Sequence, residues 1–522
     1  MSDLTQRAFT HWADAMAGEI IERRGDRPSY TLAAGITPSG TIHFGKFREV
    51  MTVDLVARAL MGMGRKVRFI YSWDDYDTFR KVPADMPGQD MLRGHLYRPI
   101  VDVPDPYGAA DSYARRNELT LETAAPSVGV GYVEYIYQHA KYRAGDYNDM
   151  IVRAMDSRDR IAGILQEFKT SEISEGWMPI ETYCEECNRD RVAFSNYDAG
   201  KKTLDYECKL CGRRGSLDLR TSRRLKLPWR VDWPMRWAYE GVDFEPGGRD
   251  HSSAGGSRET GAIIAREVFG IDSPVYAVYE NIRVKGQTKK MSSSAGNGFS
   301  LESVLEVYEP EMVRWFFASY KPDAMFDMAF DLDVIKNYDE FDAMERSAYA
   351  GDPYARRIYE LSQLNLEGVI PDECPFQPSF RHLCSILQIN GFDMGKTRAY
   401  YAGVIKTERD ERRFKDRAER AAFWIKNHAP DDFRFILNGK RRADVGLSAA
   451  EAKFVSALKA ELSRAWPDDR SLQDRIAALV AENGLGADAY KKVYQLLISR
   501  DRGPKLAGFI RSVGEEKARE LL

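Results

Sequence analysis

The chain has 522 residues, of which 43% are hydrophobic and 30% charged, and a formal net charge of -3 at pH 7. This length suggests about two to four domains, and the small net charge excludes a general attraction to nucleic acid, so a polyanionic partner must meet local basic patches. No apolar run approaches the roughly 18 residues that span a bilayer, and the N-terminus lacks the apolar region of a signal peptide. We therefore expect a cytoplasmic protein that has no membrane partner.

The N-terminal part of the chain predicts a strand, a helix and a second strand in succession. "SYTLAAG" from Ser29 and "KVRFIYSWDD" from Lys66 are typical of strands, and "GKFREVMTVDLVARALMGMG" between them has apolar residues at helical spacing. Such a unit implies a parallel sheet, in which ligands bind beyond the carboxyl ends of the strands. At the first of these ends "TPSGTIHFGKF" opens the helix near His43, where backbone N–H groups and an imidazole could hold a phosphate.

Cysteines and basic residues mark the middle of the chain, where residues 96–224 interrupt the sheet pattern. Two C-x-x-C pairs could hold one zinc ion through four thiolates; a redox pair or chance spacing are the alternatives. Between residues 209 and 230 basic side chains far outnumber the single acid, Asp218, which indicates either a polyanion-binding patch or a solvated loop. The four candidate metal ligands are Cys184, Cys187, Cys208 and Cys211.

The sheet pattern returns with "SPVYAVYENIRV" from Ser273, which predicts one buried strand, and a charged loop follows at 285–298. Beyond about Met325 helical periodicity continues to the C-terminus, which indicates a separate helical domain.

Two motifs beside strand ends, "HFGK" at 43–46 and "KMSSS" at 290–294, together resemble the signatures of class I aminoacyl-tRNA synthetases. Those enzymes carry a HIGH-like tetrapeptide at the start of the first helix and a KMSKS-like loop after the last strand. "SWDDYDTFRKVP", "LPWRVDWPMRW", "FEPGGRDHSSAGGSR" and "LLISRDRGPKLAGFI" narrow the resemblance to the class I lysyl-tRNA synthetase family over nearly the whole chain. Phe44, Lys46 and Ser293 depart from the general class pattern.

The resemblance implies an α/β fold, with a Rossmann-type parallel-sheet catalytic domain interrupted by an insertion that carries a zinc ribbon. An all-α anticodon-binding domain is expected to follow. On this basis the catalytic domain comprises residues 1–95 and 226–325, the insertion on the acceptor-arm side 96–225, and the helical domain 326–522. The implied activity is that of a lysine–tRNA ligase, which forms lysyl-adenylate from L-lysine and ATP with Mg²⁺ and transfers lysine to the 3′ end of tRNA(Lys). Zn²⁺ would be structural, and DNA is not expected as a partner.

Site residues follow from the same resemblance, position by position. The expected catalytic residues are His43, Gly45, Lys290 and Ser292. ATP is expected to contact Pro38, Ser39, Gly40, His43, Gly45, Asp250, His251, Lys290 and Met291. The expected lysine-binding residues are Gly35, Thr37, Asp74, Asp75, Trp229, Asp232, Trp233, His251 and Tyr279. For tRNA the candidates are Arg213, Arg214, Arg223, Lys440, Arg441, Tyr494 and Arg500. Asp250 could also cap a helix that begins near Ser252.

Three other functions are compatible with parts of this pattern. A glutamyl- or glutaminyl-type ligase of the same class would use Arg230 or Arg236 near Asp232 to bind a side-chain carboxylate. A catalytically inactive tRNA-binding paralogue would usually lack the signature His or Lys, both of which are present at positions 43 and 290. A small-molecule adenylyltransferase would have no need of the long helical C-terminal part.

Overall fold

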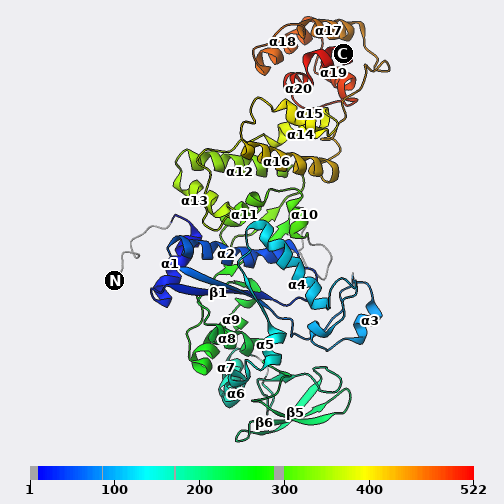
Figure 1. Ribbon diagram of the computed structural model, residues 1–522. Helices are drawn as coiled ribbons and strands as arrows, with labels where there is room; N and C mark the ends of the chain where they lie inside the picture. Colours follow the sequence, from blue (N-terminus) through cyan, green and yellow to red (C-terminus); the bar gives the residue numbers. More distant parts are fainter. Residues whose placement is uncertain (1–9, 85, 170–171, 287–298) are drawn as a thin grey trace. The chain divides into compact units, whose positions relative to one another are not determined.

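The computed structural model describes residues 10–84, 86–169, 172–286 and 299–522 (Figure 1). These residues form two compact units. Unit 1 comprises Met1–Leu305, Pro310–Met328 and Ala350–Ile370, and unit 2 comprises Glu306–Glu309, Ala329–Tyr349 and Pro371–Leu522. No helix in the described ranges is both long enough and apolar enough to cross a membrane.

A parallel sheet forms the centre of unit 1. β1 (Ser29–Ile36) pairs with β2 (Lys66–Trp73), which pairs with β3 (Glu134–Tyr137). On the other side of β1, Phe244 forms a parallel bridge with Leu32, and Val275 forms one with Phe244. The chain therefore builds outward from β1 in both directions, which is the order of a doubly wound sheet, and ligands of such sheets bind where the order reverses. β3 lies within residues 96–225, so the sheet extends into the segment that we assigned to the insertion.

Two helices lie in the N-terminal part of the chain, and the second of them is the helix predicted between the first two strands. α1 (Trp12–Arg24) contacts α2 (Phe47–Gly62), which also packs on β1 and β2. A short 3-10 turn, η2 (Phe44–Lys46), precedes α2 directly, and His43 is its N-cap. Burial of Val53 or Leu60 on α2 stabilises the fold by about 1.5–3 kcal/mol each. Gly64, at φ +78°, follows the last turn of α2.

The region between β2 and α8 carries short helices and a small antiparallel sheet. β5 (Val192–Asp198), β6 (Thr203–Cys208) and β7 (Arg214–Asp218) form the three-stranded sheet, and β4 (Glu181–Thr182) pairs antiparallel with β8 (Leu225–Lys226). The helices of this region are α3 (Gln89–Gly94), η3 (Ile100–Asp102), α4 (Tyr113–Ala124), η4 (Ala125–Val128), α5 (Gln138–Ala144), α6 (Asn148–Asp156) and α7 (Arg158–Glu167).

The second half of the catalytic part differs from the predicted single strand after Ser273. Val275 joins the parallel sheet and β10 (Val278–Tyr279) pairs with β9 (Gly247–Gly248), but β11 (Ile282–Val284) pairs with β12 (Phe326–Met328). The change of partner occurs at Glu280, whose N–H donates to the Pro322 carbonyl at 2.8 Å. The remaining elements of unit 1 are α8 (Trp229–Glu240), η5 (Arg249–His251), α9 (Ser257–Ile264), η6 (Ala265–Phe269), α10 (Leu301–Leu305), α11 (Pro310–Ser319) and α13 (Pro353–Ser362). Because β12 belongs to unit 1, the strand pattern continues slightly beyond residue 325.

The secondary structure of unit 2 is helical, without a strand among its described residues. A buried ion-pair cluster joins α16 to α12 in this unit, because the Arg417 guanidinium donates to Glu309 at 2.7 Å and to Asp342 at 2.8 Å. A second apolar core is built by the last helices of the chain. The helices are α12 (Asp333–Tyr349), α14 (Phe380–Ile389), α15 (Met394–Tyr400), α16 (Glu408–Asn427), α17 (Ala449–Glu461), α18 (Asp469–Glu482), α19 (Asp488–Ile498), α20 (Leu506–Val513) and α21 (Glu515–Leu521).

Candidate active site

A cavity of about 350 Å³ lies at the carboxyl ends of β1 and β2, beside the segment of Phe244. This is the point where the order of the sheet reverses, as expected for a ligand site in such a fold. Residues from α2, α8 and β10 complete its walls. Most of the residues predicted to bind lysine line it: Gly35, Thr37, Asp74, Trp229, Trp233, His251 and Tyr279.

Asp75 and Asp232, also predicted to bind lysine, do not line this cavity. Asp75 is fully buried and accepts hydrogen bonds from the backbone N–H and the ring of His139. β2 ends at Trp73, and in the turn that follows it Asp74 lines the cavity whereas Asp75 pairs with His139 instead. Asp232 is buried behind the cavity wall, where it accepts from the Tyr142 hydroxyl and from Arg236.

Glu49 is a cavity-lining carboxylate that the sequence analysis missed. It lies in the first turn of α2 and accepts from the Gly35 N–H at 3.0 Å and from the Tyr279 hydroxyl at 2.8 Å. A Cβ on Gly35 would approach the Ser72 carbonyl oxygen to 2.8 Å, so glycine permits the close contact between β1 and β2 here. Burial raises the pKa of Glu49 to about 7, although the two hydrogen bonds oppose this shift. The sequence did contain a signal for Glu49, because it is an acid on the side of α2 that faces the sheet.

Aromatic rings and a second acid form the opposite part of the cavity. The rings of Trp229 and Trp233 stack with centroids 5.0 Å apart, and Trp233 lies 4.8 Å from Trp237. The Trp237 indole N–H donates to Glu245, whose pKa burial raises to about 7. Indole faces and carboxylates together suit an organic cation, which gains both charge pairing and cation–π attraction. Glu240 and Asp77 add two further carboxylates to the lining.

Arg236 is the guanidinium on this lining, and it is held by two acids. It donates to Asp74 and to Asp232, and all three side chains are at most 9% exposed. Burial raises the pKa of Asp74 to about 6, while Arg236 acts in the opposite direction. The charge of Arg236 is therefore paired with protein carboxylates. Lys46 is a second cation of the lining, but the lining carboxylates outnumber the two: Glu49, Asp74, Asp77, Glu240 and Glu245.

The described residues that are predicted to bind ATP lie in two places, just before α2 and in η5. His43 is 8% exposed, and the turn at Pro38 and Ser39 is fixed by α4, because Asn117 donates to the Pro38 carbonyl at 3.0 Å and Tyr113 to that of Ser39 at 2.9 Å. Gly40 is buried and Gly45 is half-buried within η2.

Asp250 and His251 belong to η5, and His251 lies 5.6 Å from Trp233 between ring centroids. The capping role considered for Asp250 is wrong, because α9 begins at Ser257 with Gly256 as its N-cap. Lys290, Met291 and Ser292 lie outside the described residues.

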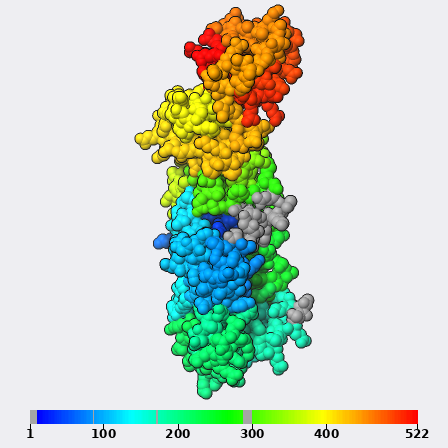
Figure 2. All heavy atoms as spheres, turned by 90° about the vertical axis from the view of Figure 1, so that its right-hand side faces the viewer, coloured from blue at the N-terminus to red at the C-terminus, as the bar shows by residue number. Residues whose placement is uncertain are grey.

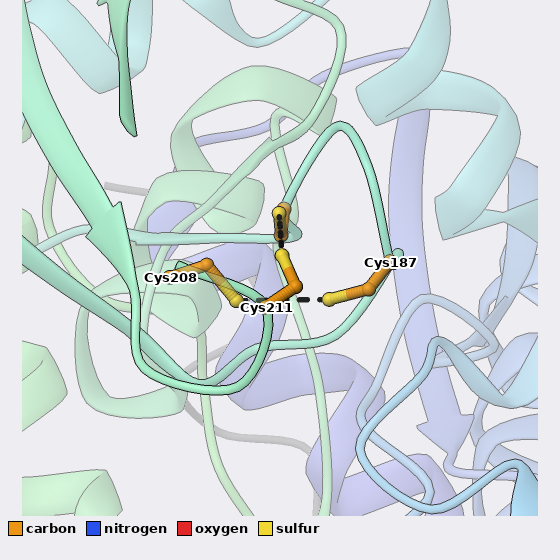
Figure 3. Close-up of side chains that lie close together, drawn as sticks. Cys187, Cys208 and Cys211 are labelled. Carbon is orange, nitrogen blue, oxygen red and sulfur yellow. Dashed lines mark hydrogen bonds between the residues drawn. The ribbon is translucent and has the colours of Figure 1, made fainter. Parts of the chain in front are cut away.

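The four predicted metal ligands come together in one cluster (Figure 3). Their sulfur atoms all lie within 4.8 Å of one another, and two pairs, Cys184 with Cys211 and Cys187 with Cys208, are 3.6 Å apart. The two knuckles have the same backbone geometry: the N–H groups of Asn188 and Gly212 donate to the carbonyls of Cys184 and Cys208. Both Asn188 and Gly212 have positive φ, which closes each turn around its thiols.

The basic residues predicted to bind tRNA have different surroundings. Arg213 and Arg214, beside the second knuckle, pair with Glu185 and Glu207, and Arg223 is exposed. In unit 2, Lys440 and Arg441 are exposed, and Arg500 lines a cavity of about 590 Å³ together with Lys426 and Arg434. Tyr494 is only 8% exposed and its hydroxyl donates to the Pro504 carbonyl, so the structure places its ring in the core rather than on a stacking surface.

Residues 10–365 match a family model described as "tRNA synthetases class I (K)". The doubly wound sheet, with HFGK directly before α2 and the ligand cavity at its switch point, is accordingly that of a class I aminoacyl-tRNA synthetase. Within that class, the chain belongs to the (K) family.

Similar proteins include the lysine–tRNA ligase of Borrelia garinii subsp. bavariensis, 42% identical over 522 residues, with 98% of each chain covered. The lysine–tRNA ligase of Treponema pallidum is 41% identical, again over 98% of each chain. Among solved structures, a glutamate tRNA ligase from Elizabethkingia meningosepticum covers 94% of this chain and 98% of its own, with a TM-score of 0.44 and 13% identity.

Proposed function

We propose that this synthetase activates L-lysine with ATP and transfers it to tRNA(Lys), and that the cavity between β1, α2 and α8 binds the lysine. The observation that carries this proposal is the charge of the cavity: Glu49, Glu245 and Asp77 line it, and its guanidinium is occupied by Asp74 and Asp232. A side-chain ammonium is the group that such a lining stabilises. The names of the similar ligases support the same substrate.

Glu49 is the best acceptor for the ε-ammonium. It is fixed by two donors, Gly35 N–H and the Tyr279 hydroxyl, and it still has acceptor capacity, because a carboxylate has about four lone-pair sites. Trp229 and Trp233 would cover the aliphatic part of the substrate. Asp74, at the end of β2, would accept from the α-ammonium.

A glutamate-type substrate fits this cavity less well. Arg230, one of the two arginines considered for a carboxylate, donates to the Gly255 carbonyl and the Thr260 hydroxyl and is absent from the lining. Arg236, the other, is already paired twice. A substrate carboxylate beside Glu49 and Glu245 would meet like charges, and the lining carboxylates outnumber its cations, Lys46 and Arg236, which disfavours binding.

The activation step needs positive charge at the α-phosphate of ATP, because the lysine carboxylate attacks that phosphorus while pyrophosphate leaves. His43, at the start of the η2–α2 helical segment, would donate to phosphate oxygens, and Asp250 would accept from the ribose hydroxyls. Mg²⁺ bound with ATP neutralises phosphate charge. Preorganised donors of this kind typically contribute about a hundred- to a thousandfold to the rate.

The cysteine cluster fits a structural Zn²⁺ ion. Sulfur atoms about 2.3 Å from a zinc ion at tetrahedral angles lie about 3.8 Å apart, close to the 3.6 Å between the paired thiols. Four thiolates would fill the coordination shell, so the ion would stabilise the two knuckles and leave no open position for chemistry.

We infer that the helical unit binds the anticodon. Its cavity of about 590 Å³ combines an apolar floor with Lys426, Arg434 and Arg500, which suits an unstacked base and its phosphates. Lys440 and Arg441 would meet further phosphates, and Arg213, Arg214 and Arg223 those of the acceptor arm. We expect this reaction to take place in the cytoplasm.

Aminoacylation of tRNA tests this proposal. Incubation with ATP, Mg²⁺, tRNA(Lys) and labelled amino acid should give a charged product with lysine and none with glutamate or glutamine. Charging with glutamate in place of lysine would contradict the assignment of the cavity.

A further inference from the structure

A second cavity, of about 420 Å³, adjoins the proposed lysine site in unit 1. The two cavities share three lining residues, Thr37, Asp77 and Trp229. A group bound in the second cavity would therefore lie on the other side of a wall one side chain thick. Ser39, expected above to contact ATP, also lines it, but no substrate group has been assigned to the space itself.

The shared wall is rigid and polar. The Thr37 hydroxyl donates to Asp77 at 2.7 Å, and Lys226 on β8 forms an ion pair with the other oxygen of Asp77. Burial opposes ionisation of Asp77, but Lys226 and Thr37 outweigh it and lower the pKa of this carboxyl. The wall thus presents an ionised acceptor and a hydroxyl close to the bound amino acid.

Trp229 adds an aromatic surface to both cavities. Its indole N–H is buried and has no hydrogen-bond partner among the described residues. The ring stacks on Trp233 on one side, and it borders the second cavity as well as the first. An aromatic wall of this kind can stack on a nucleobase of any identity, because every base has a π-face.

The outer wall of the second cavity is cationic. Arg80 and Lys81 line it, and both are exposed. Arg80 pairs with Asp190 at 2.8 Å but keeps 57% of its side chain exposed, and Lys81 forms no ion pair with another described residue. Asp190 follows the first cysteine knuckle, so this wall lies against the region of the cysteine cluster. In Figure 2 the blue segment around α3 lies directly beside the green segment that carries this cluster.

We propose that the second cavity receives the 3′-terminal nucleoside of the tRNA, with Arg80 and Lys81 binding the phosphates that precede it. The inference rests on the proposed function and adds the position of the acceptor end. Asp77 and Thr37 would orient the terminal ribose hydroxyl toward the lysyl-adenylate. Trp229 would border the base.

The transfer step balances without a further reactant. The ribose hydroxyl oxygen attacks the lysyl carbonyl carbon, a new C–O ester bond forms, and the bond from that carbon to the phosphate oxygen breaks. AMP leaves with the electron pair, and its phosphate takes up the hydroxyl proton. Asp77 is a positioning residue in this step, because it accepts a hydrogen bond from the hydroxyl and stays ionised through Lys226.

A thermodynamic cycle of binding affinities, measured with two proteins and two tRNAs, tests the proposal. Affinities are measured for tRNA(Lys) and for the same tRNA lacking its terminal adenosine, with the unaltered chain and with a double variant, Arg80→Ala and Lys81→Ala. Truncation should weaken binding to the unaltered chain about tenfold, the loss of one stacked base, and weaken binding to the double variant less than about threefold. The matched control is Lys201→Ala, which removes a side chain that is 79% exposed on the same unit and should leave the tenfold effect intact.

Equal truncation costs in both proteins would overturn the inference and leave the lysine assignment unaffected. If the double variant also had a raised KM for ATP, the equal truncation costs would assign the two cations to the phosphates of ATP. If neither tRNA bound the unaltered chain, the proposed function itself would fail, and the inference with it.

Discussion

The Tyr279 hydroxyl donates to the Glu49 carboxylate at 2.8 Å, although the two residues stand 230 positions apart in the chain. Glu49 comes from the helix that follows HFGK, and Tyr279 from β10 in the second half of the catalytic part. The contact therefore joins the two halves at the floor of the cavity. It fixes one carboxylate oxygen, so that the charge can meet a substrate ammonium without rearrangement.

Replacement of Glu49 by glutamine should raise the KM for lysine by about 10- to 100-fold, because one charge-assisted hydrogen bond contributes about 1.5–3 kcal/mol. The measurement is lysine-dependent ATP–pyrophosphate exchange. Tyr279→Phe, which removes only the supporting donor, should raise the KM by a smaller factor. Equal KM values for Glu49→Gln and the unaltered chain would show that another acid binds the ammonium.

Lysine binding should depend on pH with a midpoint near the pKa of Glu49, about 7. Below that pH the carboxyl is protonated and cannot pair with the ammonium, which stays charged because its own pKa is about 10.4. Affinity should therefore fall as pH decreases, by at most about tenfold per pH unit for this one group, and level off above pH 8. Calorimetry between pH 5.5 and 8.5 measures the profile. In Glu49→Gln the profile should be flatter, and an unchanged slope would remove Glu49 as its cause.

Local periodicity predicted the first strand, α2 and the second strand well, because each is a short-range pattern of apolar residues. It did not predict the parallel bridges of Phe244 and Val275, which depend on contacts with β1 far away in sequence. In the site, the resemblance named both Asp74 and Asp75 as lysine-binding residues, but it could not tell Asp74, which lines the cavity, from Asp75, which pairs with His139. Glu49 was missed because an acid in the first turn of a helix is usually solvated.

Arg236 should be essential for folding stability. Substitution by methionine keeps an unbranched, flexible side chain but leaves Asp74 and Asp232 as buried carboxylates without their cation. Breaking such a pair costs about 3–5 kcal/mol. Urea unfolding measures the loss. Arg23→Met, which breaks an ion pair whose arginine is 52% exposed, should change stability by less than about 1 kcal/mol. Similar small effects for both variants would contradict the buried network.

The cysteine cluster should hold one zinc ion per chain, released when a ligand is lost. Cys184→Ser should lower the metal content and destabilise the ribbon, whereas Cys384→Ser, a buried thiol outside the cluster, should keep the metal. Elemental analysis of the purified proteins measures the content. Full metal in Cys184→Ser would reject the four-thiolate site.

His43→Ala should reduce pyrophosphate exchange by about a hundred- to a thousandfold, because one donor to the phosphate is lost. Binding of tRNA should remain, since His43 lies at the start of the η2–α2 helical segment and not among the proposed tRNA-binding residues. Exchange and a tRNA filter-binding assay on the same preparation separate the two effects. Loss of both together would indicate that the variant is misfolded or that His43 acts in tRNA binding.

The most direct test of the central claim is ATP–pyrophosphate exchange with each of the twenty amino acids, run with and without tRNA. The acidic, aromatic cavity predicts exchange with lysine, either by the protein alone or once tRNA is added. Exchange with glutamate or glutamine would contradict the reading of the cavity, and no exchange under either condition would contradict the proposed activity itself.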